Sequence, residues 1–203
     1  LNIVRPLMLG GATSMYCGCA APPPGWLKDR HGVDIDAEVA ETVEELGIAP
    51  LPDERLGKAS TRIAEAAQGL GQDWQPQAKF MRPDRCSMDE CGARCMLGCR
   101  CGAKWNAAEY VDEAVAGGAE LHTRARVDRV LIEDGHAVGV QGRLGRRAFT
   151  ARAETVVLAA GGIGSPRILQ ASGLDEAGVG MTMDATVMVY GFVPEAGIGR
   201  EPP

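Results

Sequence analysis

Aromatic side chains are scarce in this chain: they make up 4% of the 203 residues. Long apolar runs are absent too, and no stretch approaches the roughly 20 residues that a membrane-spanning helix needs. Lysine and arginine are scattered rather than grouped, and the net charge is −6. This pattern argues against a nucleic-acid-binding surface and against a polybasic membrane patch. With no signal-like pattern of charge followed by apolar residues at the N-terminus, we expect a cytoplasmic protein with no membrane span.

Glycine, in contrast, is abundant at 27 residues, and 45% of the chain is hydrophobic. Such a composition supports a real core and suits a backbone that approaches a ligand closely. The sequence begins at Leu1 rather than methionine and ends at Glu201-Pro202-Pro203. We therefore expect an internal fragment of a longer protein.

Cysteine is concentrated in one place, because five of the seven cysteines fall between positions 86 and 101, in CSMDECGARCMLGCRC. Thiolates on a glycine-containing loop can converge on iron or zinc, with Cys91-x3-Cys95-x3-Cys99 as the candidate ligand set. Disulfides and simple buried thiols remain open as alternatives, since spacing alone fixes neither connectivity nor metal. For the separate pair Cys17 and Cys19, small buried residues are the favoured interpretation.

Apolar residues at helical spacing, each series followed by glycine, predict three helices, at 36–46, 60–70 and 106–116. We expect Asp36 and Asn106 to cap two of them. Alternating residues predict strands at 119–123, 125–133, 137–141 and 147–151, with a hairpin turn at Asp134-Gly135. A small antiparallel meander follows from this order.

The segment ETVVLAAGGIGSPRILQASGL, residues 154–174, decides the predicted fold class. Its continuous apolar run predicts a strand buried on both faces, as in a parallel sheet. The glycine cluster and Ser165-Pro166 then predict a turn and the start of a helix, where backbone amides can face a phosphate. We expect an α/β fold: part of a Rossmann-like FAD-binding domain, with a parallel strand plus the antiparallel meander, and part of a second, substrate domain.

These residues resemble the glucose–methanol–choline (GMC) family of FAD-dependent oxidoreductases. VVLAAGGIGSPRILQASGL resembles the family's second signature, LGGATS (9–14) its glycine-rich flavin segment, and RVDRVLIEDGHAVGV (126–140) the strand pair beside adenine. Residues 183–191 resemble the first strand of the substrate-domain sheet. The implied division is a glycine-rich segment at 1–25, a helical segment at 26–85, a cysteine-rich loop at 86–104, an FAD-domain part at 105–175 and the substrate-domain start at 176–203.

The resemblance implies that a small-molecule alcohol is oxidised to a carbonyl by hydride transfer to FAD. It places the cofactor against seven positions: Gly10, Gly11, Ala12, Thr13, the main chain at Val127, Ala160 and Gly161. The family's GxGxxG turn and its histidine-bearing C-terminal region are not in this sequence. The catalytic base is therefore unknown, and the three histidines, His31, His122 and His136, are expected at the surface.

The cysteine segment is similar to that of the FAD-dependent glucose and fructose dehydrogenases, where a comparable run holds a three-iron cluster. The similarity implies an iron–sulfur cluster on Cys91, Cys95 and Cys99 and an electron-acceptor protein as partner. The competing hypothesis is an electron-transfer or metal-binding module in which the cysteine loop is itself the function.

Overall fold

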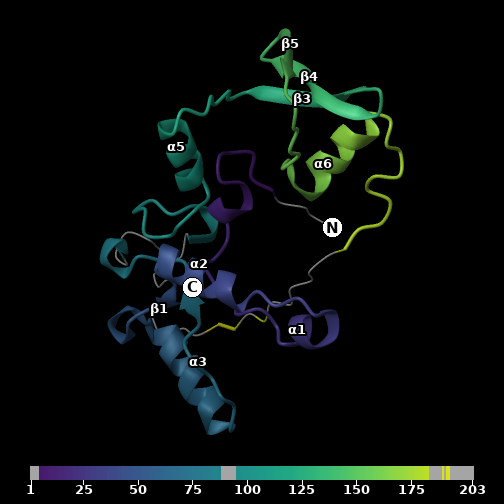
Figure 1. The fold of residues 1–203 in the computed structure, drawn as a ribbon. Helices are drawn as coiled ribbons and strands as arrows, with labels where there is room; N and C mark the ends of the chain where they lie inside the picture. The colour runs from purple at the N-terminus through teal and green to yellow at the C-terminus, as the bar shows by residue number, and fades with distance from the viewer. Residues whose placement is uncertain (1–4, 88–94, 183–188, 190, 193–203) are drawn as a thin grey trace. The chain divides into compact units, whose positions relative to one another are not determined.

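The computed structural model describes residues 5–87, 95–182, 189 and 191–192 of the chain. Two compact units make up the chain: residues 1–119 with 191–203, and residues 120–190. Figure 1 shows the elements of each unit with their labels. The mixture of helices and sheets confirms the expected α/β class.

The helices of the first unit end at or close to glycines of the sequence. Gly47 ends α2 in the left-handed conformation, with φ 61°, which glycine adopts without steric cost. Asp36 is the first helical residue rather than the cap, and its N–H donates to the Asp34 carboxylate at 3.2 Å. The bounds are α1 (Trp26–His31), α2 (Asp36–Leu46), α3 (Lys58–Gly69) and α5 (Ala108–Ala116), with short 3-10 helices η1 (Gly11–Ser14), η2 (Asp53–Arg55), η3 (Pro83–Arg85) and η4 (Cys95–Leu97).

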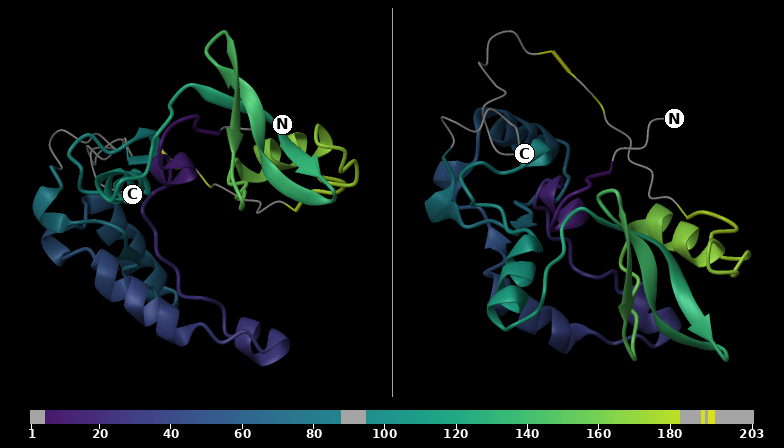
Figure 2. Two further views of the ribbon diagram at one scale, coloured as in Figure 1. Left: turned by 45° about the horizontal axis from the view of Figure 1, so that its top comes forward. Right: turned by 90° about the horizontal axis from the view of Figure 1, so that it is seen from above.

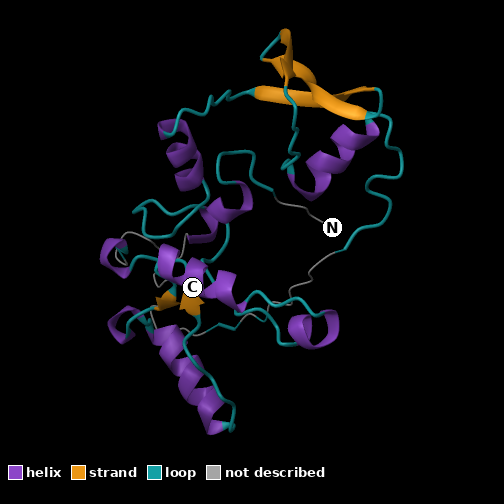
Figure 3. Ribbon diagram, in the orientation of Figure 1, coloured by secondary structure: helices purple, strands orange, loops and turns teal. Residues whose placement is uncertain are grey.

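The core of the first unit lies in its loops rather than under its long helices. Its buried cluster comprises Leu51, Met81, Cys86 and Ala103, with Cys99 and Cys101 packed against it. Strands β1 (Ala49–Pro50) and β2 (Ala78–Lys79) pair antiparallel, and single bridges join Cys19 to Lys79 and Met81 to Lys104. Figure 3 shows how much of this unit is loop.

Helices α2 and α3 bury no residue. Ile63 on the apolar face of α3 is 53% exposed, and Leu70 just after it is 80% exposed. The predicted helices are thus confirmed, but their apolar faces have no buried side chain among the described residues.

The second unit is an antiparallel meander, as predicted, of β3 (Ala125–Glu133), β4 (His136–Leu144) and β5 (Arg147–Arg152) in the order β3-β4-β5. Asp134 and Gly135 have φ of 48° and 79°, which is the turn geometry that matches strand twist in a two-residue hairpin. Gly142 is required in β4, since a Cβ there would lie 2.0 Å from the Arg126 carbonyl oxygen.

Helix α6 (Gly161–Gln170) lies against one face of the meander, as both views of Figure 2 show. The hydroxyl of Ser172, just after the helix, joins the two elements. It accepts a hydrogen bond from the Val130 N–H at 2.8 Å and donates to the Ile168 carbonyl at 2.6 Å. The end of α6 is therefore fastened to the middle of β3.

Two predicted strands do not form. Residues 154–160 are loop, and Val157 is 83% exposed, because no strand among the described residues pairs with them. Residues 119–123 are loop as well, between Gly118 at φ 99° and Arg124 at φ 58°, both of which lie outside the extended conformation of regular strand residues.

The start of α6 also differs from the prediction. The helix begins at Gly161, four residues before Ser165, and Pro166 lies inside it. The Ser165 hydroxyl accepts a hydrogen bond from the Ala160 N–H at 3.0 Å, so it supports the turn that leads into the helix instead of capping it. The strand predicted at 183–191 falls largely outside the described residues.

Candidate cofactor-binding site

The glycine-rich segment forms a tight turn followed by η1. Gly10 has φ 80°, and a Cβ on it would lie 2.8 Å from Asn106 Oδ1 and 3.0 Å from the Ala108 nitrogen. Any side chain at this position would therefore collide with the start of α5. Gly11, at φ 51°, is different, because no atom lies within 4 Å of where its Cβ would be.

Hydrogen bonds fix this turn to residues more than 90 positions further along the chain. Thr13 Oγ1 accepts a hydrogen bond from the Ala107 N–H at 2.9 Å and donates to the Gly10 carbonyl. Asn106 Oδ1 accepts from the Ala108 N–H at 2.9 Å, but the N-cap of α5 is Ala107, so the prediction that Asn106 caps this helix is wrong by one position. Thr13, and through its hydroxyl the Gly10 carbonyl, are thus tied to the residue just before α5.

Lys104 is the second tie between the two segments. Its side chain is buried, at 2% exposure, and its ammonium donates to the carbonyls of Ser14 at 3.2 Å, Tyr16 and Cys95 at 2.6 Å. The three N–H groups of the ammonium are all used, and Nζ also lies 4.8 Å from the centre of the Tyr16 ring. Burial lowers the pKa of Lys104, while the nearby thiols of Cys95, Cys99 and Cys17 act in the opposite direction.

Tyr16 completes this buried polar group. Its hydroxyl donates to the Trp105 carbonyl at 3.0 Å. Burial, together with the nearby charges of Cys19 and Glu109, raises the pKa of Tyr16 to about 12. The phenol is therefore neutral at physiological pH and acts as a hydrogen-bond donor.

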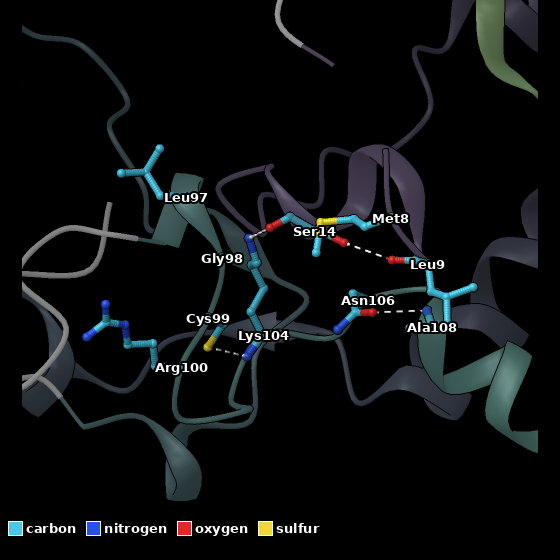
Figure 4. A pocket seen from close by; sticks show the side chains of 10 residues that line it. All are labelled: Met8, Leu9, Ser14, Leu97, Gly98, Cys99, Arg100, Lys104, Asn106 and Ala108. Atoms are coloured by element: carbon cyan, nitrogen blue, oxygen red, sulfur yellow. Dashed lines mark hydrogen bonds between the residues drawn. The ribbon is translucent and has the colours of Figure 1, made fainter. Parts of the chain in front are cut away.

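A pocket of about 910 Å³ opens beside the glycine-rich turn. Figure 4 shows that residues from three segments line it: the turn, the cysteine loop and the start of α5. Its wall is mixed, with apolar side chains, backbone and a few polar groups, which is the usual character of a small-molecule site. The lining residues are Met8, Leu9, Ser14, Leu97, Gly98, Cys99, Arg100, Lys104, Asn106 and Ala108.

The cysteine loop contributes one wall of this pocket. Cys99 Sγ lies 3.6 Å from Cys101 Sγ and accepts a hydrogen bond from the Lys104 N–H at 3.3 Å. Burial raises the pKa of the Cys101 thiol, but hydrogen bonds from the backbone at Ser87 and Ala103 and from Cys99 outweigh it, so that this pKa is lowered. Cys86 and Cys95 are buried.

Two of the three predicted metal ligands lie among the described residues. Cys91 lies outside the described residues, whereas Cys95 is fully buried and Cys99 faces the pocket. Within residues 5–87 and 95–182, no three His, Cys, Asp or Glu side chains are grouped so that they could hold a metal ion. The described part of the loop therefore gives the iron–sulfur prediction no support.

The remaining predicted cofactor residues belong to the second unit. Val127 is half-buried on β3 and pairs with Gly142, next to an irregularity that leaves Asp128 without a partner in the register. Ala160 precedes α6, and Gly161 opens it at φ 76° with no atom within 4 Å of its missing Cβ. Gly161 thus leaves open space at a helix N-terminus, as a nucleotide would require.

Sequence reasoning missed the role of Lys104. It named no buried lysine. The one feature of the sequence that could have drawn attention to Lys104 is its position directly after the cysteine- and glycine-rich stretch CRCGA. It also missed the ion pair between Arg82 and Glu109, which joins the loop before η3 to the first turn of α5 through contacts of 3.1 and 2.7 Å. Neither spacing nor periodicity indicates contacts of such long sequence separation.

Comparison with known proteins identifies the family of this chain. The sequence profile of the GMC oxidoreductases matches residues 26–187. The chain belongs to the GMC oxidoreductase family. The match includes the cysteine loop, the meander and α6, while the glycine-rich turn lies just before it. Members of this family bind FAD.

Individual relatives agree with the family match. An uncharacterized GMC-type oxidoreductase of Mycobacterium tuberculosis, found in strains CDC 1551 and H37Rv, is 32% identical over 179 residues, which is 82% of this chain. A 2-methyl-1,2-propanediol dehydrogenase of Mycolicibacterium austroafricanum is 31% identical over 148 residues, or 70% of this chain. The chain spans only 28% and 24% of the length of these relatives.

No described helix is both long and apolar enough to cross a membrane.

Proposed function

We propose that the complete protein is an FAD-dependent oxidoreductase that oxidises a small alcohol to a carbonyl compound. The observation that carries the proposal is the glycine-rich turn, fixed by α5 beside a pocket, in a chain of the GMC family. The dehydrogenase relative, named for a diol, supports an alcohol as substrate class. When bound, FAD supplies the acceptor for the hydride that leaves the carbon of the alcohol.

The residues present fit such a cofactor at two places. Gly11 and Gly161 both have positive φ, and both leave the space around a missing Cβ empty. A flat ring or a nucleotide could approach the backbone there to a distance that any side chain would prevent. We assign Gly10, Gly11, Ala12 and Thr13 to one part of the FAD site, and the main chain at Val127 with Ala160 and Gly161 to another.

Each group of residues has a distinct task in this proposal. Gly10 and Thr13 hold the turn rigid through α5, so that the backbone of Gly11 and Ala12 faces the cofactor in one conformation. Lys104 keeps the cysteine loop against the same turn and thereby holds together two of the segments that line the pocket. The open N-terminus of α6 offers backbone N–H groups to an anionic or polar edge of the nucleotide.

The domain division at 1–25, 26–85, 86–104, 105–175 and 176–203 is part of the same proposal. An electron-acceptor protein as partner of the complete enzyme is a proposal too. The iron–sulfur module is not put forward as a second function, because among the described residues no three His, Cys, Asp or Glu side chains are grouped so that they could hold a metal ion.

The test uses the complete protein, purified under conditions that retain cofactors. We expect flavin absorbance in the visible range, and we expect it to bleach under anaerobic conditions when a short-chain alcohol or diol is added. The control is the same addition of a matched alkane or ether, which lacks the hydroxyl and should leave the spectrum unchanged. A protein without flavin, or a bound flavin that no alcohol reduces, would contradict the proposal.

A further inference from the structure

The cysteine loop places two thiols next to each other without a disulfide bond between them. Cys99 Sγ and Cys101 Sγ are 3.6 Å apart, on either side of Arg100. We propose that Cys99 and Cys101 form a reversible dithiol–disulfide site that exchanges with low-molecular-weight disulfides. This inference is independent of the proposed FAD chemistry.

The backbone around the pair can accommodate the bond. A disulfide holds its two sulfurs about 2 Å apart, so they must approach by roughly 1.5 Å. Gly98, at φ 111°, and Gly102, at φ 68°, flank the pair, and neither would bring a Cβ within 4 Å of another atom. Rotation of the two cysteine side chains about χ1, with small backbone changes at Arg100, can bring the sulfurs together. The glycines on either side can take up the compensating backbone changes, so that the packed residues beyond them need not move.

The pair is also reachable. Cys99 lines the pocket of about 910 Å³, and both cysteines are half-buried rather than enclosed. Figure 4 shows the Cys99 sulfur beside Lys104 on the pocket wall, with the Arg100 side chain pointing away from them. A small disulfide that enters the pocket can thus meet Cys99, whereas Cys95 at 0% exposure is shielded from it.

The exchange balances without any other reactant. One cysteine thiolate attacks a sulfur of the small disulfide, forms a mixed disulfide and releases one small thiolate. The second cysteine, as thiolate, attacks the protein sulfur of that mixed disulfide and releases the second small thiolate. Both protein thiol protons go to solvent or to the released thiolates. The two cysteines lose two electrons together, and the small disulfide gains them.

The chain offers a direct readout for this bond. Trypsin cleaves after Arg94, Arg100 and Lys104, which separates Cys99 in peptide 95–100 from Cys101 in peptide 101–104. The full-length protein is equilibrated with oxidised and reduced glutathione at several ratios, quenched with acid, alkylated and digested without reductant. We expect the two peptides to appear joined, in a proportion that rises with the oxidised fraction of glutathione and falls again on reduction.

Two variants decide which sulfurs are joined. In Cys95→Ala the joined peptides should persist, because Cys95 is not a partner. In Cys99→Ala they should fall by at least about tenfold, with Cys101 trapped as the mixed disulfide with glutathione.

Three results would overturn the proposal. The first is a joined peptide that persists in Cys99→Ala, which would make Cys95 the partner of Cys101. The second is mixed disulfides alone in the wild-type protein at every glutathione ratio. The third is that Cys99 and Cys101 react only after a chelator has removed a bound metal, which would assign the two thiolates to a metal site.

Discussion

The Thr13 side-chain oxygen accepts a hydrogen bond from the backbone N–H of Ala107 at 2.9 Å, across 94 positions of sequence. The same oxygen donates its proton to the Gly10 carbonyl. One hydroxyl thereby satisfies a backbone donor at the start of α5 and fixes the conformation of the glycine-rich turn. The conformation of the proposed cofactor site therefore depends on this contact.

Thr13→Val should weaken both the fold and the retention of flavin. The replacement has the same shape but leaves the Ala107 N–H without its acceptor, at a cost of about 1 kcal/mol in the free energy of unfolding. Chemical denaturation and the flavin-to-protein absorbance ratio of the complete protein measure the two effects. Thr13→Ser keeps the hydroxyl and serves as control, so a serine variant as weak as the valine variant would refute the assigned role of the oxygen.

Lys104→Met should be the most destabilising single change in the first unit. Removal of the ammonium takes a buried donor away from the carbonyls of Ser14, Tyr16 and Cys95, of which the Cys95 carbonyl keeps only a long hydrogen bond from the Gly98 N–H at 3.4 Å. We expect a loss of roughly 3 kcal/mol, read from the denaturation midpoint. The matched control is Lys28→Met, where an exposed lysine pairs with Asp34 and Asp36 in solvent, and its midpoint should hardly move. An equal loss of stability in the two variants would contradict the role of the Lys104 ammonium in connecting these segments.

Acid should weaken the contact between Arg82 and Glu109. Hydrogen bonds from Arg82, opposed in part by burial, lower the pKa of the Glu109 carboxyl below its usual range. The unfolded chain therefore takes up this proton first as pH falls below about 4.5, so the contribution to stability is complete above that pH and is lost below it.

Glu109→Gln provides the measurement of this effect. It should lower the free energy of unfolding near neutral pH by about 1 kcal/mol, a modest value because both side chains are partly solvated. The difference from wild type should shrink toward zero in strong acid. If the difference in the free energy of unfolding between wild type and Glu109→Gln stays constant with pH, the ion pair is ruled out as the cause of that difference.

The sequence predicted local features well, for reasons that are visible in the residues. Asp134-Gly135 can hardly form anything but a tight hairpin turn, and Gly47 ends α2 because it accepts positive φ without strain. Features that need distant partners were missed or wrong. The apolar run at 154–160 has strand propensity, yet a strand requires a neighbouring ladder, and the described residues supply none.

The candidate site divides in the same way. The glycines were visible as a motif, and the positive φ and open surroundings of Gly11 and Gly161 agree with a close approach by a ligand. Lys104, Asn106 and Ala107 were not visible as site residues, because their task is to contact a segment about 90 positions earlier in the chain. The separation of Cys99 from Cys101 could not be predicted either, since it depends on the side-chain dihedral angles of the two cysteines and on the backbone conformation at Arg100.

Gly161→Ala should lower flavin retention in the complete protein if the N-terminus of α6 approaches the cofactor. Gly71→Ala is a closely matched control, because both glycines have φ 76° and both leave 4 Å of open space. The backbone strain of the two variants is therefore similar, and their difference in flavin affinity reports the cofactor alone. We expect about tenfold weaker flavin binding, roughly 1.4 kcal/mol, for Gly161→Ala relative to Gly71→Ala. Identical affinities would remove α6 from the proposed site.

The central claim is that the glycine-rich turn of this chain lies against FAD, and the pair Gly11→Ala and Gly47→Ala tests it most directly. Both glycines have positive φ, 51° and 61°, and neither has an atom within 4 Å of an added Cβ. The measurement is the flavin-to-protein ratio of the complete protein after purification, at matched folded content by circular dichroism. The account predicts that Gly11→Ala loses most of its flavin while Gly47→Ala retains it. Full flavin content in a well-folded Gly11→Ala protein would contradict it.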